Sequence, residues 1–359
     1  MTTVDRATEG RTVDHAWLHG AITRIFRSEG FSAKAAGLVA TSLVQAELTG
    51  VASHGAMLVP MYVDRLRAGS VSRHENAEVV HRHGAVTVLD GRHALGQLTG
   101  HQAMRLAVDA AKEHGVGVSV VRHAFHFGRA ATYGELAAEH GCLGIAMSNT
   151  RPLMPAVGGA EPVVGNNPLA VVAPTPDGPI SLDMALSEAA LGKIRLAEAA
   201  GTSIPDTWAT DKDGNPTTTA AAAVGGMLLP TGGPKGFGLA LMIDVLTGVL
   251  SGGAFGDGVK GLYADVSVPN DCAHFFLALD VAAFGDPDSF AARIEALAAF
   301  VLGSRTRPGV DAVMLPGQRE REEAQRRLAD GIWLPGSVVS GLRSAAENVG
   351  TTLPEEPAR

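Results

Sequence analysis

The sequence predicts a mixed α/β (α+β) fold, in which a central sheet is flanked by a helical domain built from both ends of the chain. Three observations lead to this class. Short runs rich in β-branched residues and bounded by glycine and proline cluster in the middle of the chain. Segments with apolar residues at helical spacing lie towards both ends. With 359 residues the chain also exceeds the size that one hydrophobic core usually organises, so we expect two or more subdomains.

Helices are expected first at the N-terminal end. Residues 13–50 predict two helices, the second of which starts after the N-cap Ser32 and ends at Gly50. A third helix is expected over 55–67 and is ended by Gly69. At the C-terminal end the expected helices are at about 288–303, 317–329 and 336–347. Because helices gather at both ends of the chain, we expect the two sets to pack together.

The middle of the chain supplies the sheet. The expected strands are 85–90, 116–121, 143–147, 168–173, 180–184 and 274–279. A helix at about 100–113 precedes the second strand, and a helix entered through residues 125–128 follows it. Between the last two strands we expect a helix at 187–200, a polar loop at 201–219 and a buried helix at 234–251.

This order of elements divides the chain into three expected domains. They are a helical domain of residues 12–83 and 286–348, a sheet domain of 84–186 and 254–285, and a small, mainly helical subdomain of 187–253.

Charge and cysteine content exclude several classes of protein. The formal charge of −8 and the lack of a Lys/Arg run argue against a nucleic-acid or anionic membrane partner. Cys142 and Cys272 lie in apolar runs and are expected to be small core residues rather than a disulfide pair. The first 17 residues lack an apolar signal core, and the apolar run at 237–250 is too short to span a membrane. We therefore expect a soluble, cytoplasmic protein.

His126 is the first candidate for chemistry. It stands in the run Phe125-His126-Phe127-Gly128, just past a predicted strand, and strand ends are where open sheets usually place reactive groups. An imidazole there can exchange a proton near neutral pH. The alternative from the residues alone is a histidine that caps a helix or lies in the core.

Ser53 and His54 form a second candidate at a helix boundary. A hydroxyl beside an imidazole can bind and protonate a substrate oxygen, although an N-cap serine followed by a helix-start histidine is an alternative. No G-x-S-x-G motif surrounds Ser53, which argues against a serine hydrolase. The histidines at 81, 83, 123 and 126 lack cysteine or carboxylate partners at ligand spacing, so no metal is expected.

Five segments can hold a phosphorylated cofactor. Glycine and asparagine follow strand ends at 149–152 and 165–168, where the backbone can approach a phosphate or a nicotinamide amide, or simply form tight turns. Asp183 ends another strand and can bind a ribose or cap a helix. Lys235 and the Pro316-Gly317-Gln318 turn stand at helix starts, which attract anions. Neither G-x-G-x-x-G after a strand nor G-x-x-x-x-G-K-[ST] is present, so two common nucleotide sites are excluded.

Together these segments resemble the malate/L-lactate dehydrogenase type II family, which includes ureidoglycolate and sulfolactate dehydrogenases. The resemblance covers about residues 12–345. Its most specific parts are SHG at 53–55, HFG at 126–128, GGAEPVVGNNPLA at 158–170, LDMALS at 182–187, IPDTWATDKDGNPTT at 204–218 and GGPKGFGLALMIDVLTGVLSG at 232–252.

The resemblance implies an NAD- or NADP-dependent oxidoreductase with a non-Rossmann nicotinamide-binding sheet domain. Hydride would pass between the nicotinamide and C2 of a small 2-hydroxy or 2-oxo acid. His126 then matches the proton acceptor and Ser53 and His54 match residues at the substrate oxygen, although which histidine carries the proton stays open. The matching cofactor contacts are Thr150, Asp183, Met184, Ala185, Lys235, Pro316, Gly317 and Gln318. The resemblance also implies a homodimer.

One position departs from the family pattern. A basic residue that can bind the substrate carboxylate commonly follows SHG by three positions, whereas this chain has Leu58 there and retains Tyr62 as a substrate residue. We hypothesise that Arg151 binds the carboxylate instead. Two alternatives follow: a reductase of a cyclic imino acid or of another substrate without the usual carboxylate contact, or a cofactor-binding protein without catalytic activity.

Overall fold

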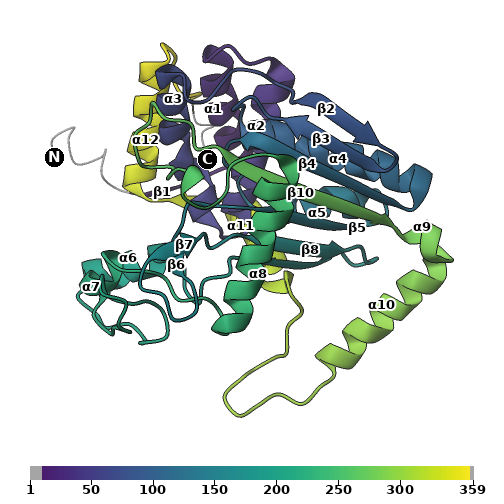
Figure 1. The fold of residues 1–359 in the computed structure, drawn as a ribbon. Coiled ribbons are helices and arrows are strands. Elements are labelled where there is room, and N and C mark those ends of the chain that lie inside the picture. Colours follow the sequence, from purple (N-terminus) through teal and green to yellow (C-terminus); the bar gives the residue numbers. More distant parts are fainter. Residues whose placement is uncertain (1–9, 356–359) are drawn as a thin grey trace.

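A seven-stranded sheet lies at the centre of the computed structural model, which describes residues 10–355 (Figure 1). The strand order is β2-β3-β4-β10-β5-β8-β9. The strands are β2 Glu78–His83, β3 Val86–Asp90, β4 Val116–Ala124, β5 Cys142–Ser148, β8 Leu169–Ala173, β9 Ile180–Met184 and β10 Cys272–Asp280. β3 and β4 run parallel and the other neighbours are antiparallel. The predicted mixed α/β class is confirmed, and all six predicted strands are present.

One face of the sheet is covered by two helices, α4 (Gly96–His114) and α5 (Ala131–Glu139). Small residues of these helices pack with β4, β5 and β10 in a common hydrophobic cluster. The helix predicted to follow residue 125 starts only at Ala131, because β4 continues to Ala124 and residues 125–130 form a loop. This loop holds His126 at the end of the strand.

The terminal helices form a second cluster. It contains α1 (His15–Ser28), α2 (Ala33–Leu48), α3 (Val59–Ala68) and α12 (Gly336–Asn348). The predicted cap is present, since Ser32 Oγ accepts the amide of Ala35 at 3.2 Å. β1 (Arg11–Val13) pairs with β11 (Ile332–Leu334), which ties the two ends of the chain together.

A third hydrophobic cluster gathers residues from 154 to 243. Its elements are β6 (Met154–Pro155), β7 (Pro162–Val164), α6 (Leu191–Ala200), α7 (Ala220–Val224) and α8 (Pro234–Asp244), which continues into a π-helical turn at Val245–Val249. The short helix η5 (Gly256–Gly258) follows. The helix predicted over 187–200 begins four residues late, because the amide of Glu188 donates to Leu229 O at 2.8 Å instead of entering the helix.

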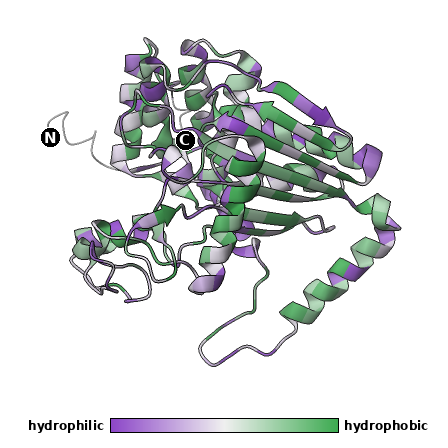
Figure 2. Cartoon of the chain, viewed as in Figure 1, coloured by the Kyte–Doolittle hydropathy of each residue, from purple (hydrophilic) through white to green (hydrophobic). Residues whose placement is uncertain are grey.

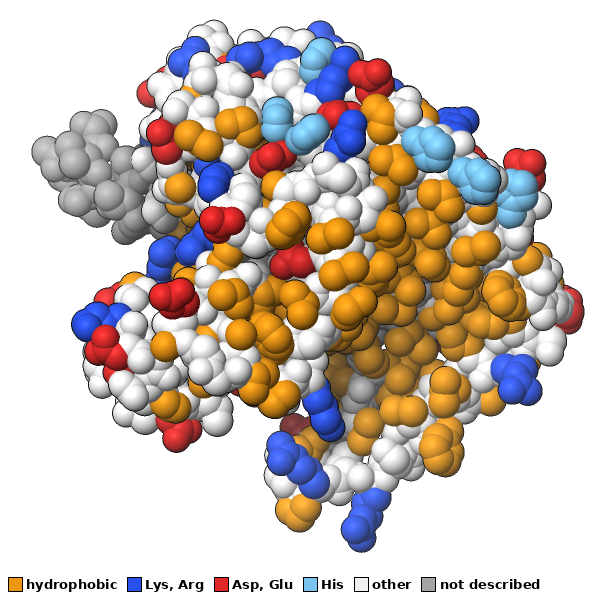
Figure 3. Space-filling view, viewed as in Figure 1, with side chains coloured by type: hydrophobic (Ala, Val, Ile, Leu, Met, Phe, Trp, Pro, Cys, Tyr) orange, Lys and Arg blue, Asp and Glu red, His pale blue; other side chains and the backbone are white. Residues whose placement is uncertain are grey.

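The prediction that 234–251 forms a buried helix is wrong for the outer side of α8. Leu241 and Met242 are exposed, the latter to 51%, while Ala240 and Ile243 face the third cluster. Figure 2 shows apolar residues along this helix, and Figure 3 shows that hydrophobic side chains gather on the same face of the molecule. An apolar surface of this kind commonly marks a contact with another protein.

A second uncovered helix is α10 (Pro287–Leu302), which follows α9 (Val281–Phe284) and stands away from the body (Figure 1). Asp286 caps it, since its side chain accepts the amide of Ser289, but none of its residues is buried. Phe300 is 80% exposed. The helix itself was correctly predicted from its local sequence pattern. The prediction that it packs on the other terminal helices is wrong. By contrast, α11 (Gln318–Asp330) packs on α2.

No helix within residues 10–355 has the length and apolar character needed to cross a bilayer. Residues 1–9, part of the N-terminal segment in which no signal core is expected, lie outside the described residues.

Candidate active site

Ser53 and His54 lie in a short 3-10 turn, Ala52–His54, which a second turn, Ala56–Leu58, follows. The helix predicted over 55–67 therefore starts only at Val59. Gly55 between the turns is extended, and a Cβ there would collide with the buried side chain of Glu47. Glu47 Oε1 also accepts the amide of Ala56 at 2.8 Å, so this carboxylate fixes the shape of the turn.

His126 lies beside Ser53 and His54 and forms a cluster with them and Tyr62. Its ring stacks on the ring of His54, with centroids 5.3 Å apart and an interplanar angle of 29°. The hydroxyl of Tyr62 lies 2.7 Å from His126 Nδ1, and Ser53 Oγ lies 2.9 Å from His54 Nδ1. Each imidazole therefore has one nitrogen occupied and presents Nε2 as its free nitrogen.

Both rings are held neutral near neutral pH. Burial lowers the pKa of His126 well below its ordinary value, and the neighbouring His54 and His274 lower it further. Burial also lowers the pKa of His54, and the guanidinium of Arg129 adds to this effect. A neutral imidazole is the form that can accept a proton from a hydroxyl.

Tyr62 was expected at the substrate, and the structure places it behind His126. Its side chain is fully buried, and its hydroxyl accepts a hydrogen bond from Gln97 Nε2 at 2.9 Å. Burial raises the pKa of Tyr62, so its hydroxyl keeps its proton. Sequence reasoning missed Gln97; an amide at the start of an otherwise apolar helix face was the available signal.

Leu58 does not face the site. It is buried in the cluster of terminal helices, so the position that is commonly basic in the family contributes to the core here. Arg151 is exposed and lies against Gly261. Partial burial of its guanidinium and the charge of Arg195 both lower the pKa of Arg151, so a second cation lies nearby. Among the described residues, no hydrogen bond or ion pair joins Arg151 to either histidine.

Thr150 is fixed by two asparagines of the segment 165–168. Its amide donates to Asn167 Oδ1 at 2.9 Å, and its hydroxyl donates to Asn166 Oδ1 at 2.9 Å. Asn167 Nδ2 donates to Ala240 O, which ties the group to α8. The asparagines therefore orient Thr150 in addition to forming a turn.

The side chain of Asp183, which stands on β9, reaches the start of α5. Its Oδ2 accepts the amide of Ala131 at 2.9 Å, and Arg129 Nε is 3.9 Å away. Arg129 is only 5% exposed and binds both carboxylate oxygens of Glu135, at 2.6 and 2.9 Å. Burial raises the pKa of Asp183, while the Ala131 amide and Arg129 oppose this shift. Sequence reasoning also missed Arg129, although it directly follows the HFG motif and is charged in an apolar stretch.

The Pro316-Gly317-Gln318 turn docks beside this carboxylate. Pro316 O accepts the amide of Ser181, two residues from Asp183, at 3.1 Å. Gly317 has φ of 80° and lies so close to Ser181 that a Cβ would collide with it. A cavity of about 470 Å³ borders Ser181, Gly317 and Arg129. Met184 ends the strand that carries Asp183 and Ala185 directly follows it; both are half-buried.

Lys235 is exposed in the first turn of α8. The amide of Thr231 donates to Leu186 O at 2.9 Å, so the start of this helix lies close to Ala185 and Leu186, which follow β9. The amides of the first helical turn and the ammonium group of Lys235 together favour an anion.

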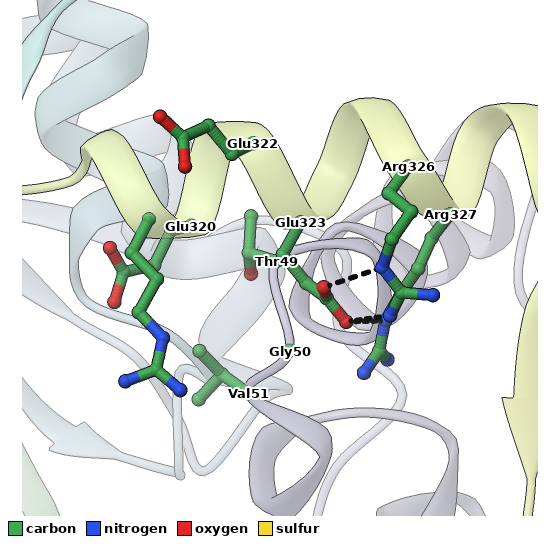
Figure 4. Close-up of a pocket in the computed structure, with 9 residues that line it drawn as sticks. Thr49, Gly50, Val51, Glu320, Glu322, Glu323, Arg326 and Arg327 are labelled. Carbon is green, nitrogen blue, oxygen red and sulfur yellow. Dashed lines mark hydrogen bonds and ion pairs between the residues drawn. The ribbon is translucent and has the colours of Figure 1, made fainter. Parts of the chain in front are cut away.

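A larger cavity, about 530 Å³, lies apart from the histidines, between α11 and residues 49–51 (Figure 4). Its wall includes two ion pairs, in which Glu323 binds Arg326 at 2.7 Å and Arg327 at 2.5 Å. Arg327 Nη1 also donates to Glu47 O at 2.6 Å. This region therefore supports the turn that carries Ser53 and His54. Within residues 10–355, no three His, Cys, Asp or Glu side chains are arranged to hold a metal ion.

Comparisons with known proteins identify the family. The family model described as malate/L-lactate dehydrogenase matches residues 13–343. A malate dehydrogenase of Pyrococcus horikoshii is 37% identical over 341 residues, which cover 93% of this chain and 94% of that protein. Ureidoglycolate dehydrogenase (NAD(+)) of Escherichia coli strain K12 is 33% identical over 330 residues, covering 92% and 94%.

The fold agrees with a solved structure of the same group. Sulfolactate dehydrogenase from Methanocaldococcus jannaschii superposes with a TM-score of 0.91 at 33% identity, covering 96% of this chain and 98% of that one. These matches place the chain among the nicotinamide-dependent dehydrogenases. It belongs to the malate/L-lactate dehydrogenase family, as the sequence motifs indicate.

Proposed function

We propose that this protein is an NAD(P)-dependent dehydrogenase that moves hydride between the nicotinamide and C2 of a small 2-hydroxy or 2-oxo acid. The observation that carries the proposal is the pair of neutral, stacked imidazoles of His54 and His126, each of which presents Nε2. Oxidation of a hydroxy acid needs a base for the hydroxyl proton while the hydride leaves the carbon.

In the proposed mechanism His126 Nε2 takes the hydroxyl proton during oxidation and returns it during reduction. Tyr62 supports this step, because its hydroxyl oxygen can accept the Nδ1 proton of the imidazolium that forms. Ser53 and His54 hold the reacting oxygen. Membership of the family and the position of His126 at the strand end support this division of roles.

The cofactor supplies the hydride acceptor, and the chain offers groups whose chemistry fits it. Asp183 can accept hydrogen bonds from ribose hydroxyls, and Lys235 with the start of α8 can bind a phosphate. Thr150, Met184, Ala185 and the turn of Pro316, Gly317 and Gln318 complete the proposed contacts. The proposed cofactor is NAD or NADP.

Arg151 is the proposed carboxylate ligand. Its exposed guanidinium stands near a second cation, Arg195, so a negatively charged substrate group is favoured there. Because Leu58 is buried in the core, Arg151 is the proposed source of the positive charge for the substrate.

A panel of 2-oxo acids and cyclic imino acids, assayed with NADH and with NADPH by the loss of nicotinamide absorbance, tests the function. Turnover of a 2-oxo acid is expected, and the Arg151→Ala variant should raise its KM about tenfold at similar kcat. Exposed Lys212 forms an ion pair with its neighbour Asp213, so Lys212→Ala is the control. Turnover of cyclic imines alone would replace the proposed substrate, and an inactive protein that binds the cofactor would overturn the enzymatic role.

We also propose a homodimer. The sheet face opposite α4 and α5 is only partly covered by α8 and the turn that follows it, and it carries half-buried apolar side chains such as Ile145 and Leu277. This face lies beside the exposed apolar surfaces of α8 and α10 (Figure 3). A second copy of the chain is the proposed cover for this surface. Light scattering should give twice the chain mass, and Phe300→Glu should weaken the assembly; a monomer at all concentrations would contradict it.

The buried, free thiols of Cys142 and Cys272 are typical of a reducing compartment, so the proposed location is the cytoplasm.

A further inference from the structure

Three side chains form a continuous hydrogen-bonded row behind the free nitrogen of His126. Gln97 on α4 contacts Tyr62 on α3, with Gln97 Nε2 donating to the tyrosine oxygen at 2.9 Å. The tyrosine hydroxyl in turn lies 2.7 Å from His126 Nδ1. Tyr62 is fully buried and Gln97 is 1% exposed, so the row is closed to bulk solvent.

The row has one open end. Gln97 Oε1 is buried and has no hydrogen-bond partner among the described residues. An unpaired buried amide oxygen costs free energy, which native proteins usually avoid. The two ends of a carboxamide have nearly the same shape, so a half-turn of the Gln97 side chain places Oε1 against the Tyr62 hydroxyl in place of Nε2.

The two orientations of Gln97 leave different protons on His126. When Nε2 of Gln97 donates to Tyr62, the tyrosine proton points at His126 Nδ1, so the neutral ring carries its proton on Nε2 and cannot act there as a base. When Oε1 of Gln97 accepts from Tyr62, the tyrosine oxygen accepts the Nδ1 proton of His126. Nε2 is then free to take a proton, and the resulting imidazolium keeps the same hydrogen bonds.

We propose that Gln97 is a positioning residue whose carboxamide orientation selects the tautomer of His126 through Tyr62. This inference rests on the proposed dehydrogenase function, in which His126 Nε2 exchanges the proton with the substrate oxygen. The unpaired Oε1 is the acceptor that Tyr62 requires whenever His126 carries its Nδ1 proton.

Other titratable groups also face this row. His54 stacks on His126 from the 52–54 turn, and His274 on β10 is a second imidazole whose proximity lowers the pKa of His126. Tyr62 has Tyr263 and Cys272 as electrostatic neighbours. None of these groups hydrogen-bonds Gln97 within the described residues, so its substitution changes the His126 tautomer without removing them.

Substitutions of Gln97 that keep its size test the proposal. Gln97→Met removes the acceptor, so the imidazolium is less stable and kcat should fall about tenfold. In the pH profile of kcat/KM for hydroxy acid oxidation, the acidic limb should move to lower pH. Gln97→Glu supplies an acceptor with negative charge and should move that limb to higher pH. Thr99→Val, a buried polar change on the same helix, is the control and should leave the limb in place.

If the proposal is right, Gln97 affects His126 only through Tyr62. In a Tyr62→Phe background, Gln97→Met and Gln97→Glu should no longer shift the limb in opposite directions. If both substitutions shift the limb in the same direction as each other, or neither differs from Thr99→Val, the role assigned to Gln97 is wrong.

A second measurement does not depend on turnover or on the Met variant folding. In protein labelled with ¹⁵N-imidazole histidine, two-bond ¹H–¹⁵N correlations report the His126 tautomer, and the signal is assigned by its loss in His126→Asn. Gln97→Glu should increase the Nδ1–H form relative to the natural protein; an unchanged ratio would overturn the proposal. Altered tautomers in a protein that reduces no 2-oxo acid would instead refute the proposed function alone.

Discussion

The two halves of the candidate site are built in different ways. Ser53, His54, Tyr62 and His126 contact one another directly, through hydrogen bonds of 2.7 and 2.9 Å and a stacked ring pair. The proposed cofactor residues come from four separate segments, and three of these are fixed by their own neighbours: Thr150 by asparagines, Asp183 by the Ala131 amide, the 316–318 turn by Ser181.

This difference indicates a division of labour. Proton transfer depends on sub-ångström placement and on shifted pKa values, and those side chains hold one another in place through their own contacts. A large cofactor can be held by many separate contacts, and losing one of them weakens binding without disturbing the others. Substitutions in the histidine half should therefore reduce kcat, whereas substitutions in the cofactor half should raise the KM for the cofactor.

The largest effect is expected for His126→Asn. Loss of the proton-accepting nitrogen should lower kcat about a thousandfold in both directions, the usual contribution of general acid–base catalysis. The KM for NAD(P)H should stay close to that of the natural protein. Steady-state kinetics with both substrates varied provides the measurement, and an active variant with full turnover would remove His126 from the mechanism.

The next effect concerns stability in acid, and it arises from His274 behind the histidine half. This residue is fully buried against Phe127, and burial lowers its pKa from 6.5 to about 3. Between these two values the unfolded chain binds a proton that the folded chain does not, so the free energy of unfolding falls as the pH falls from 6.5 towards 3.

By about pH 5 this group alone should have removed about 2 kcal/mol. Denaturant titrations at several pH values measure the loss, and His274→Phe should reduce its pH dependence while retaining the ring stack. Equal acid sensitivity in the variant and the natural protein would show that other groups dominate.

The smallest effect is expected in the cofactor half. Lys235→Ala should raise the KM for the cofactor about three- to tenfold with little change in kcat, because one exposed cation contributes modestly to phosphate binding. Fluorescence titration with NADH and NADPH measures the affinity directly, with Lys212→Ala as the matched control. A large fall in kcat at saturating cofactor would mean that the two halves are not separable.

The regular elements and the family were predictable, because alternation, helical spacing and glycine positions are local properties of the sequence. Ser32 shows this well: its cap fixed the start of α2 to the residue. The ends of elements near the site were less predictable. The start of α3 depends on the contact of Gly55 with Glu47, which lies eight residues earlier, and β4 is extended by pairing with the distant β10.

Two features could not be predicted from the local sequence pattern: what covers a helix, and which side chains support the site residues from behind. The sequence of α10 specifies a helix but not what covers it, and the apolar outer face of α8 looks the same whether the chain or another copy buries it. Gln97 and Arg129 were missed for a related reason. Each acts through a residue distant in the sequence, and only the folded chain shows Gln97 beside Tyr62 or Arg129 beside Asp183.

Leu58 has a practical consequence for protein engineering. A designer seeking broader activity on dicarboxylates would first restore the basic residue that the family commonly has at this position. Here that substitution would start from a side chain packed among helices and would introduce a charge into their core. Libraries directed at the exposed neighbourhood of Arg151 and Arg195 should yield more folded variants with altered substrate preference than libraries centred on position 58.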